Sequence, residues 1–266
     1  MNTGNAVALH HTLEGPEDAP VLVASNSLGT TLRMWDDQAH ALLERFRLLR
    51  YDHRGHGSSP VPTGPYKIDD LGHDIMTLLD RLEVEHFSFC GLSVGGAVGM
   101  WLASEVPERV ERLVLCCTAA RFAPPEQWDE RAETVRSEGV GAISDAVIER
   151  WFTPPFRESR PEAVEWAGGM LRNTPAEGYA GCCEAIRDAD LRSKLGAIRA
   201  PTLVVAGAED PAAPVEEAEL IRDSSPDARL VVVEQAAHLA NVEQPETFTQ
   251  TVLEHLEPVA MERTGR

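Results

Sequence analysis

Short runs of apolar, β-prone residues recur along the first part of the chain, at residues 20–24, 46–52, 87–90 and 112–117. Between them, residues 35–46 and 68–82 place apolar side chains at the spacing that is typical of amphipathic helices. Because strands and helices alternate regularly, the pattern predicts an α/β fold, in which a mostly parallel sheet is covered by helices on both faces.

This alternation stops between residues 121 and 195. The stretch contains several helical patterns and no convincing strand, and it is rich in tryptophan, arginine and proline. The strand pattern returns at residues 201–210 and again at 228–233. We therefore expect a core made of residues 1–120 and 196–266, with residues 121–195 inserted as a helical cap subdomain.

The run at residues 87–90 leads into Gly91-Leu92-Ser93-Val94-Gly95, which fits the G-x-S-x-G nucleophile elbow. The glycines let a strand and a helix approach closely, and the central serine is held in a strained conformation that presents its hydroxyl. The pentapeptide alone is a weak signal, because glycine and serine are common in loops. A strand pattern before it and a helical pattern after it strengthen the prediction that Ser93 is a nucleophile.

A serine hydroxyl acts as a nucleophile when a base lies within hydrogen-bond reach and a carboxylate orients that base. In a fold of this kind the acid and then the histidine follow the serine along the chain. Asp210 and His238 each come directly after a predicted buried strand, so their loops should meet at one edge of the sheet. His238 alone would be better explained as a packed histidine, but the three residues together favour a triad of Ser93, Asp210 and His238.

Two polar loops also follow predicted strands. Residues 25–30 lie where backbone amides could bind an oxyanion, and the alternative is an ordinary turn. Residues 52–59 contain His53 and His56, but no third ligand is spaced nearby on a regular element. We interpret the second loop as a structural turn and expect no metal site.

Composition and charge narrow the range of partners. The chain has 24 Lys and Arg against 43 Asp and Glu, a net charge of −19, which argues against nucleic acid or an anionic membrane as a partner. The five cysteines include no C-x-x-C pair, so we expect reduced core residues. Without a signal-peptide pattern or a membrane-spanning apolar run, we expect a cytoplasmic protein, with residues 262–266 as a disordered tail.

Several motifs resemble those of the α/β-hydrolase superfamily over nearly the whole chain, at residues 26–30, 52–57, 91–96, 207–210 and 237–238. More narrowly, the chain resembles the 3-oxoadipate enol-lactone hydrolases of aromatic catabolism. That resemblance lies in residues 25–30 with 32–35, and in residues 150–154 and 178–188. Cap sequences diverge widely among these hydrolases, so agreement in the last two segments carries more weight than agreement at the elbow.

The resemblance implies a catalytic triad of Ser93, Asp210 and His238, with the backbone N–H groups of Leu28 and Val94 as the oxyanion hole. It also implies a small carboxylated lactone as substrate and no cofactor. Alternatives are another serine hydrolase of the same fold, such as a carboxylesterase, a C–C hydrolase or a cofactor-free haloperoxidase-like enzyme, and a signalling receptor of the same fold. A dehalogenase or an epoxide hydrolase is disfavoured, because such enzymes place aspartate at the elbow.

A negatively charged protein that binds a negatively charged lactone needs a local cation near its pocket. The predicted triad and oxyanion loop offer none, so the cap arginines are the candidates. The cap segments that carry the narrow resemblance favour Arg187, with Trp151 as an apolar wall. A cap-stabilising role for Arg187 is the alternative, in which case Arg131 or Arg150 would bind the carboxylate.

Overall fold

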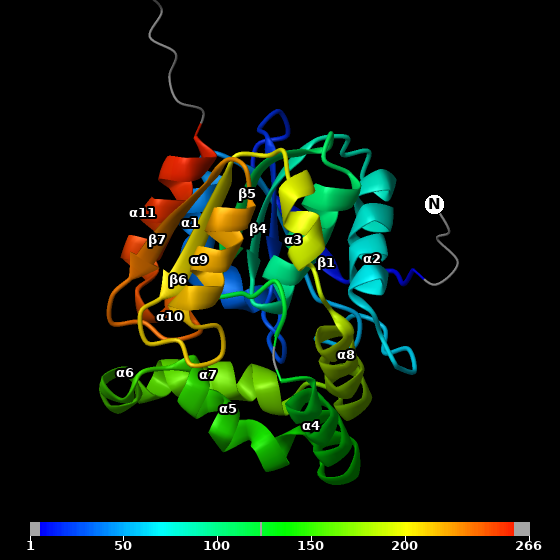
Figure 1. The fold of residues 1–266 in the computed structure, drawn as a ribbon, viewed down its shortest axis with the longest axis vertical. Helices are drawn as coiled ribbons and strands as arrows, with labels where there is room; N and C mark the ends of the chain where they lie inside the picture. The colour runs from blue at the N-terminus through cyan, green and yellow to red at the C-terminus, as the bar shows by residue number, and fades with distance from the viewer. Residues whose placement is uncertain (1–5, 123, 258–266) are drawn as a thin grey trace, which may run out of the picture.

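The computed structural model describes residues 6–122 and 124–257. Its core is a seven-stranded sheet in the order β1-β3-β2-β4-β5-β6-β7, in which β1 pairs antiparallel with β3 and the other neighbours are parallel (Figure 1). The strands are β1 (His11–Glu14), β2 (Val21–Ser25), β3 (Arg47–Tyr51), β4 (Phe87–Leu92), β5 (Val110–Cys116), β6 (Thr202–Gly207) and β7 (Ala228–Val233). The predicted α/β fold with a mostly parallel sheet is confirmed.

The extent to which each strand is buried explains which strands could be predicted from the sequence. Every residue of the central strands β4 and β6 is buried, as expected for parallel strands covered on both faces. The edge strand β1 is only partly buried and has a single strongly apolar residue, Leu13. Its sequence therefore lacks the continuous apolar run that marks the other strands, and the sequence analysis did not predict it.

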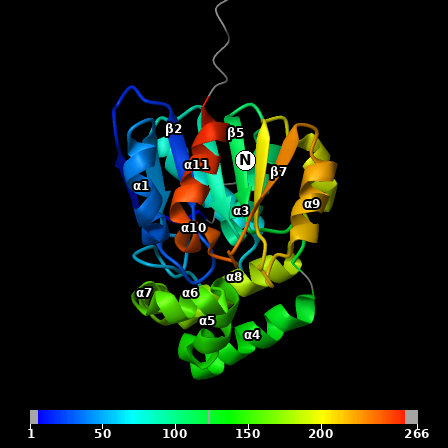
Figure 2. The same ribbon diagram turned by 90° about the vertical axis from the view of Figure 1, so that its left-hand side faces the viewer.

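Helices cover both faces of the sheet. On one face α1 and α11 contact each other, and Figure 2 shows both on the side turned toward the viewer. On the opposite face α2 packs against α3, and α9 packs against β6 and β7. The elements that cover the sheet are η1 (Leu32–Trp35), α1 (Asp36–Leu43), α2 (Ile68–Arg81), α3 (Val94–Glu105), η3 (Arg192–Ala197), α9 (Val215–Ser224), α10 (Ala240–Glu243) and α11 (Pro245–Leu256).

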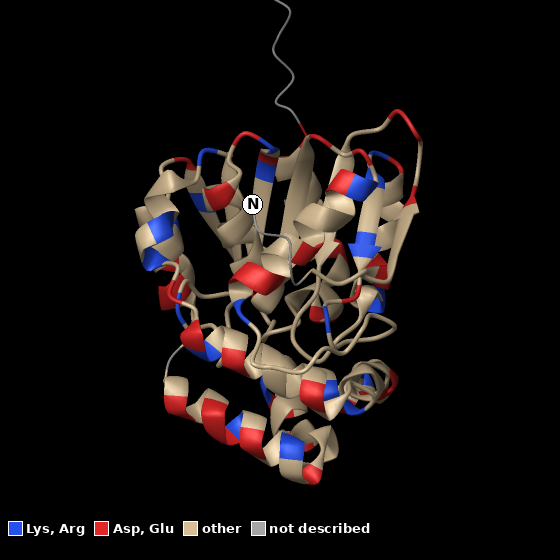
Figure 3. Ribbon diagram, turned by 90° about the vertical axis from the view of Figure 1, so that its right-hand side faces the viewer, with Lys and Arg blue, Asp and Glu red and all other residues tan. Residues whose placement is uncertain are grey.

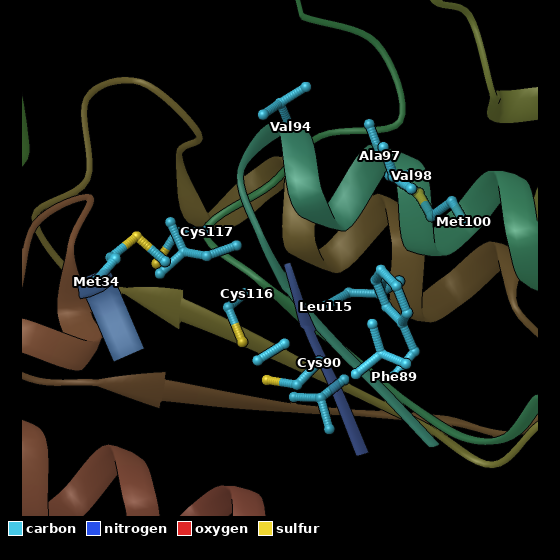
Figure 4. Close-up of a cluster of buried hydrophobic side chains, with 14 of the residues drawn as sticks. Met34, Phe89, Cys90, Val94, Ala97, Val98, Met100, Leu115, Cys116 and Cys117 are labelled. Carbon is cyan, nitrogen blue, oxygen red and sulfur yellow. The ribbon is translucent and has the colours of Figure 1, made fainter. Parts of the chain in front are cut away.

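Helix α3 is the central helix and is apolar almost all round, which is why it can lie buried against the sheet. Figure 4 shows Phe89 and Leu115 on the side of the strands that faces α3, with Cys90 and Cys116 on the other side. The helix approaches closely because Gly99 has no side chain: a Cβ there would lie 2.9 Å from the Phe89 ring. This packing fixes the start of α3, where the elbow lies.

The inserted segment is helical and lies below the sheet in Figure 1, at the carboxyl ends of the parallel strands. Its elements are α4 (Pro125–Glu138), η2 (Val140–Ile143), α5 (Ser144–Trp151), α6 (Pro154–Ser159), α7 (Pro161–Arg172) and α8 (Ala176–Asp188). The predicted helical insertion is confirmed. Residues 121 and 195 as its limits stay a prediction.

Cap helix α8 is docked tightly on the loop that contains Gly55. A Cβ on Gly178 would lie 2.0 Å from the Gly55 carbonyl oxygen, so neither position has room for a side chain. The Gly64 N–H donates to the carboxylate of Glu177 over 2.8 Å, which adds a second attachment. The Arg136 guanidinium also bonds Glu177, and thereby ties α4 to α8. The cap is thus held to the core by backbone contact as well as by charge.

The remaining sequence expectations concern cysteines, membranes and charge. All five cysteines are buried and none forms a disulfide. No helix in residues 6–122 and 124–257 has the length and apolarity needed to cross a bilayer. On the face shown in Figure 3, acidic and basic residues are interspersed. The predicted tail, residues 262–266, lies outside the described residues.

Candidate active site

Ser93 lies at a sharp turn between the last residue of β4 and the first of α3. Its backbone angles are φ 59° and ψ −119°, a conformation that costs a non-glycine residue about 1–3 kcal/mol. Neighbouring glycines make the turn possible: a Cβ on Gly91 would lie 2.2 Å from the Gly95 carbonyl oxygen, and a Cβ on Gly95 would lie 2.4 Å from that of Ser25. The Ser93 N–H donates to the Cys116 carbonyl over 2.9 Å, which anchors the turn to β5.

Asp210 and His238 are joined by a buried hydrogen bond of 2.8 Å between Nδ1 of the imidazole and Oδ2 of the carboxylate. The other carboxylate oxygen accepts from the N–H groups of Ala212 and Ala213, at 2.8 and 3.1 Å. Because an ionised carboxylate only accepts, the histidine proton is on Nδ1 and Nε2 is left as an acceptor. Glu209, the neighbouring acid, is exposed, so the structure brings Asp210 to the histidine as the sequence predicted.

The three predicted triad residues meet at one edge of the sheet, since each follows a parallel strand. Ser93 follows β4, Asp210 lies three residues after β6, and His238 lies five residues after β7. Their exposed fractions are 6%, 4% and 4%. Ser93 and His238 both line the same cavity. This arrangement can place a hydroxyl, a base and an orienting carboxylate beside one bound molecule.

The backbone amides of Leu28 and Val94 are available as donors near Ser93. Neither N–H donates a hydrogen bond within the described part of the chain. Leu28 lines the cavity together with Ser93, and Val94 is the first residue of α3, where a helix end presents positive potential. The Gly95 N–H donates to the Asn26 carbonyl over 3.2 Å and so ties the two loops together. Two unused amides held this way can stabilise an oxyanion.

The loop that carries Leu28 is fixed by buried polar contacts. The amide of Asn26 donates to the Tyr51 carbonyl over 2.7 Å and accepts from the Trp35 indole N–H over 3.1 Å. Gly29, with φ 78°, donates its N–H to Nε2 of His56 over 3.0 Å. His56 is therefore a structural acceptor, in agreement with the interpretation of this loop as a turn.

His53, like His56, is buried and in hydrogen-bond contact with the backbone of the loop that carries Leu28. Its Nε2 lies 3.1 Å from the Asn26 carbonyl, and burial lowers its pKa to about 3. Burial also lowers the pKa of His56. Among the described residues, no group of three or more His, Cys, Asp or Glu side chains is arranged to hold a metal ion.

The cavity has a volume of about 310 Å³ and lies between the core and the cap. Its core side includes Ser93, His238 and Leu28. Its cap side is formed by residues of α4, α5 and α8, namely Trp128, Arg131, Val147, Arg150, Trp151 and Tyr179. A small molecule in this space would contact Ser93 and His238 on one side and aromatic and cationic groups on the other.

Two cavity arginines, Arg131 and Arg150, form no ion pair with a carboxylate of the described residues. Arg131 lies over the Trp128 ring, with 4.8 Å between the guanidinium carbon and the ring centroid. Burial and the neighbouring charge of Arg131 both lower the pKa of Arg150. Two cations that repel each other across a cavity form a site suited to an anion, because a bound carboxylate would relieve the repulsion.

Arg187 does not line this cavity, although the sequence analysis favoured it as the carboxylate ligand. Its guanidinium bonds the carboxylates of Asp129 and Asp188, which links α4 to the end of α8. This geometry disfavours Arg187, which already has two acidic partners, and leaves Arg131 and Arg150 as the candidates within the cavity. Trp151 is 3% exposed and lines the cavity, where an apolar wall was expected.

Glu243 is a polar residue of this region that the sequence analysis missed. It is 5% exposed and accepts hydrogen bonds from the N–H and hydroxyl of Thr153 in the cap, and from the N–H of Ala237 next to His238. Burial raises its pKa, and the three donors oppose that shift. A glutamate five residues after a candidate histidine carries no signal by itself, since its cap partner lies 90 residues away.

Comparison with known proteins identifies the family to which the fold belongs. A family model described as the alpha/beta hydrolase fold matches residues 6–144 and 163–245, which is most of the chain. The chain belongs to the α/β-hydrolase family. The break between the two matched parts, residues 145–162, falls in the cap.

Individual relatives of this α/β-hydrolase are similar over nearly its whole length. It is 43% identical to 3-oxoadipate enol-lactonase 2 of Acinetobacter baylyi, covering 94% of this chain and 93% of that protein. The crystal structure of the enol-lactonase from Burkholderia xenovorans has a TM-score of 0.92 at 43% identity, covering 94% of this chain and 96% of that one. A hydrolase from Pseudomonas aeruginosa has a TM-score of 0.93 at 46% identity, covering 97% of both chains.

Proposed function

We propose that this protein is a 3-oxoadipate enol-lactonase, a hydrolase that opens the ring of 3-oxoadipate enol-lactone to give 3-oxoadipate. The observation that carries the proposal is the 43% identity to a relative of that name over 94% of the chain. A match of that extent includes most of the helical cap, which forms one side of the cavity. The reaction belongs to the β-ketoadipate route of aromatic catabolism, and the expected location is the cytoplasm.

The first step of the proposed reaction is attack on the lactone carbonyl. Nε2 of His238 removes the proton from the Ser93 hydroxyl, and the oxygen forms a bond to the carbonyl carbon. Asp210, bonded to Nδ1, stabilises the imidazolium that forms. The negative charge on the former carbonyl oxygen is stabilised by the unused amides of Leu28 and Val94.

Ring opening then breaks the bond between the acyl carbon and the ring oxygen. The leaving group is an enolate, which takes the proton from the His238 imidazolium and becomes a ketone. The opened form therefore does not readily close again, and His238 is once more a base. Water, deprotonated by His238, then attacks the acyl group on Ser93 and releases 3-oxoadipate. The alternative route, in which His238 activates water for direct attack on the lactone, uses the same base and the same oxyanion donors.

The carboxylate of the substrate is proposed to bind the two cavity arginines. A five-membered lactone with an acetate arm is small enough for a cavity of about 310 Å³. With its carbonyl at Ser93, its arm would extend toward the cap, where Arg131 and Arg150 lie. Charge-assisted hydrogen bonds there would oppose the unfavourable long-range field of a protein with a net charge of −19.

The test is a comparison of two substrates with the purified protein. Freshly generated enol-lactone is followed by the loss of its ultraviolet absorbance, and phenyl acetate, a neutral ester of similar size, is followed in parallel. The proposed function predicts a kcat/KM for the lactone at least about a hundred-fold above that for the ester, the ratio expected if the carboxylate contact contributes about 3 kcal/mol. Faster turnover of the ester would instead indicate a general carboxylesterase.

A further inference from the structure

The cap segment from Trp151 to Thr153, where α5 gives way to α6, is hydrogen-bonded to the loop that carries His238. The Leu239 N–H donates to the Trp151 carbonyl over 3.0 Å. The N–H and the hydroxyl of Thr153 donate to Oε1 of Glu243 over 2.8 and 2.6 Å. Figures 1 and 2 both place α10, which ends at Glu243, beside the cap helix α6. The cap and the histidine loop are therefore joined directly.

The second carboxylate oxygen of Glu243 extends this connection to the other side of the histidine. Oε2 accepts from the Ala237 N–H over 2.6 Å. The residues before and after His238 are thus both bound to the same cap segment, Leu239 directly and Ala237 through Glu243. Because the backbone on either side helps to set the direction of a side chain, these contacts act on the imidazole together with the hydrogen bond from Nδ1 to Asp210.

The chemistry of these contacts requires a carboxylate. Glu243 accepts from three donors, and an ionised carboxylate has the acceptor sites to satisfy all of them at once. A glutamine would offer one acceptor oxygen and two unwanted donors, which would leave at least one buried N–H or hydroxyl without a partner. The position is 5% exposed, so water does not readily replace the lost acceptor.

We propose that Glu243 is a positioning residue, which ties the orientation of His238 to the position of the cap segment 151–153. Because the Trp151 side chain lines the substrate cavity, a molecule bound there contacts the same segment that holds the base in place. The inference rests on the proposed function in one respect, that His238 is the catalytic base. An error of about 1 Å in the placement of such a group can lower a rate about a hundred-fold.

The test uses four substitutions in the full-length protein. Glu243→Gln removes the charge and one acceptor. Thr153→Val removes the hydroxyl on the cap side and leaves Glu243 in place, whereas Thr153→Ser retains that hydroxyl. Glu246→Gln is the matched control, since Glu246 is exposed at the start of α11.

The readouts separate positioning from a purely structural role. We expect Glu243→Gln to lower kcat about ten- to a hundred-fold and to leave KM within about twofold of wild type. This is the result expected when the orientation of His238 is disturbed and substrate binding is not. Thr153→Val should lower kcat in the same way, Thr153→Ser should restore it, and the control should match wild type. The low-field proton resonance of the His238–Asp210 hydrogen bond should broaden in Glu243→Gln and stay sharp in the control.

A folded Glu243→Gln with wild-type kcat and an unchanged resonance would overturn the proposal, as would a variant that loses only thermal stability. If Glu243→Gln does not fold, Thr153→Val decides the question by the same two readouts. Every variant is measured with both the enol-lactone and phenyl acetate. If wild type hydrolyses only the ester, the proposed substrate is wrong, and the role of Glu243 is still decided by kcat for the ester.

Discussion

The carboxylate contact predicted in the cavity can be tested by removing one guanidinium at a time. The relevant changes are Arg131→Met, which keeps an unbranched side chain over the Trp128 ring, and Arg150→Met. Arg187→Met is the matched control, because Arg187 also belongs to the cap but bonds Asp129 and Asp188 instead of lining the cavity.

The structure sets the order of the expected losses. A charge-assisted hydrogen bond contributes about 1.5–3 kcal/mol, which corresponds to about a ten- to a hundred-fold change in kcat/KM. Arg131 is partly buried, whereas Arg150 is exposed as a whole residue although partial desolvation of its guanidinium lowers its pKa, so solvent weakens the second contact more. We expect a loss near a hundred-fold for Arg131→Met and near ten-fold for Arg150→Met.

The assay is kcat/KM for the enol-lactone and for phenyl acetate in each variant. Only the lactone should lose activity in the Arg131 and Arg150 variants, and the Arg187 variant should retain activity toward both substrates. Equal losses on the two substrates would mean that these arginines support the cap and do not bind the carboxylate. A selective loss in Arg187→Met would refute the reassignment from Arg187.

Three further outcomes are expected. Asp210→Asn should lower kcat by several orders of magnitude, because the amide cannot stabilise the cation of His238; a mild effect in steady-state kinetics would argue against the triad. Gly178→Ala should lower the free energy of unfolding by about 1–3 kcal/mol in urea titrations, since its Cβ would lie 2.0 Å from the Gly55 carbonyl, and unchanged stability would show that α8 can shift freely. Burial lowers the pKa of His255 to about 4, so the unfolded chain takes up a proton near pH 6.5 and the folded protein does not. This residue's contribution to stability is therefore complete above pH 6.5 and falls by about 3 kcal/mol as the pH drops to 4. His255→Gln should remove that part of the pH dependence, and an identical pH slope in the variant would contradict the shift.

Much of the fold was predictable because its core strands are continuous apolar runs. The strands around residues 87–92 and 202–207 are buried along their whole length, so periodicity and composition both identify them. The edge strand β1 was not predicted, because a four-residue strand with one strongly apolar side chain has no distinctive pattern. Its place in the sheet depends on backbone pairing with β3, to which side-chain patterns contribute little.

The candidate site was predictable to the extent that strand order determines it. Asp210 and His238 follow parallel strands, so topology alone brings their loops to the serine. The cap side was not predictable in this way, because helix packing decides which arginine enters the cavity. The sequence favoured Arg187, but in the structure Arg131 lines the cavity whereas Arg187 pairs with two aspartates. Glu243 was missed for the same reason, since its cap partner Thr153 is distant in sequence.

The central claim is that Ser93 attacks the lactone with His238 as its base, and the most direct test is the Ser93→Ala variant. Strand β4 and helix α3 do not depend on the hydroxyl, so the variant should fold like wild type, as judged by circular dichroism and thermal unfolding. With freshly generated enol-lactone, the account predicts loss of at least about a thousand-fold in kcat, with residual activity from the oxyanion donors alone. Lactone hydrolysis near the wild-type rate in the folded variant would contradict it.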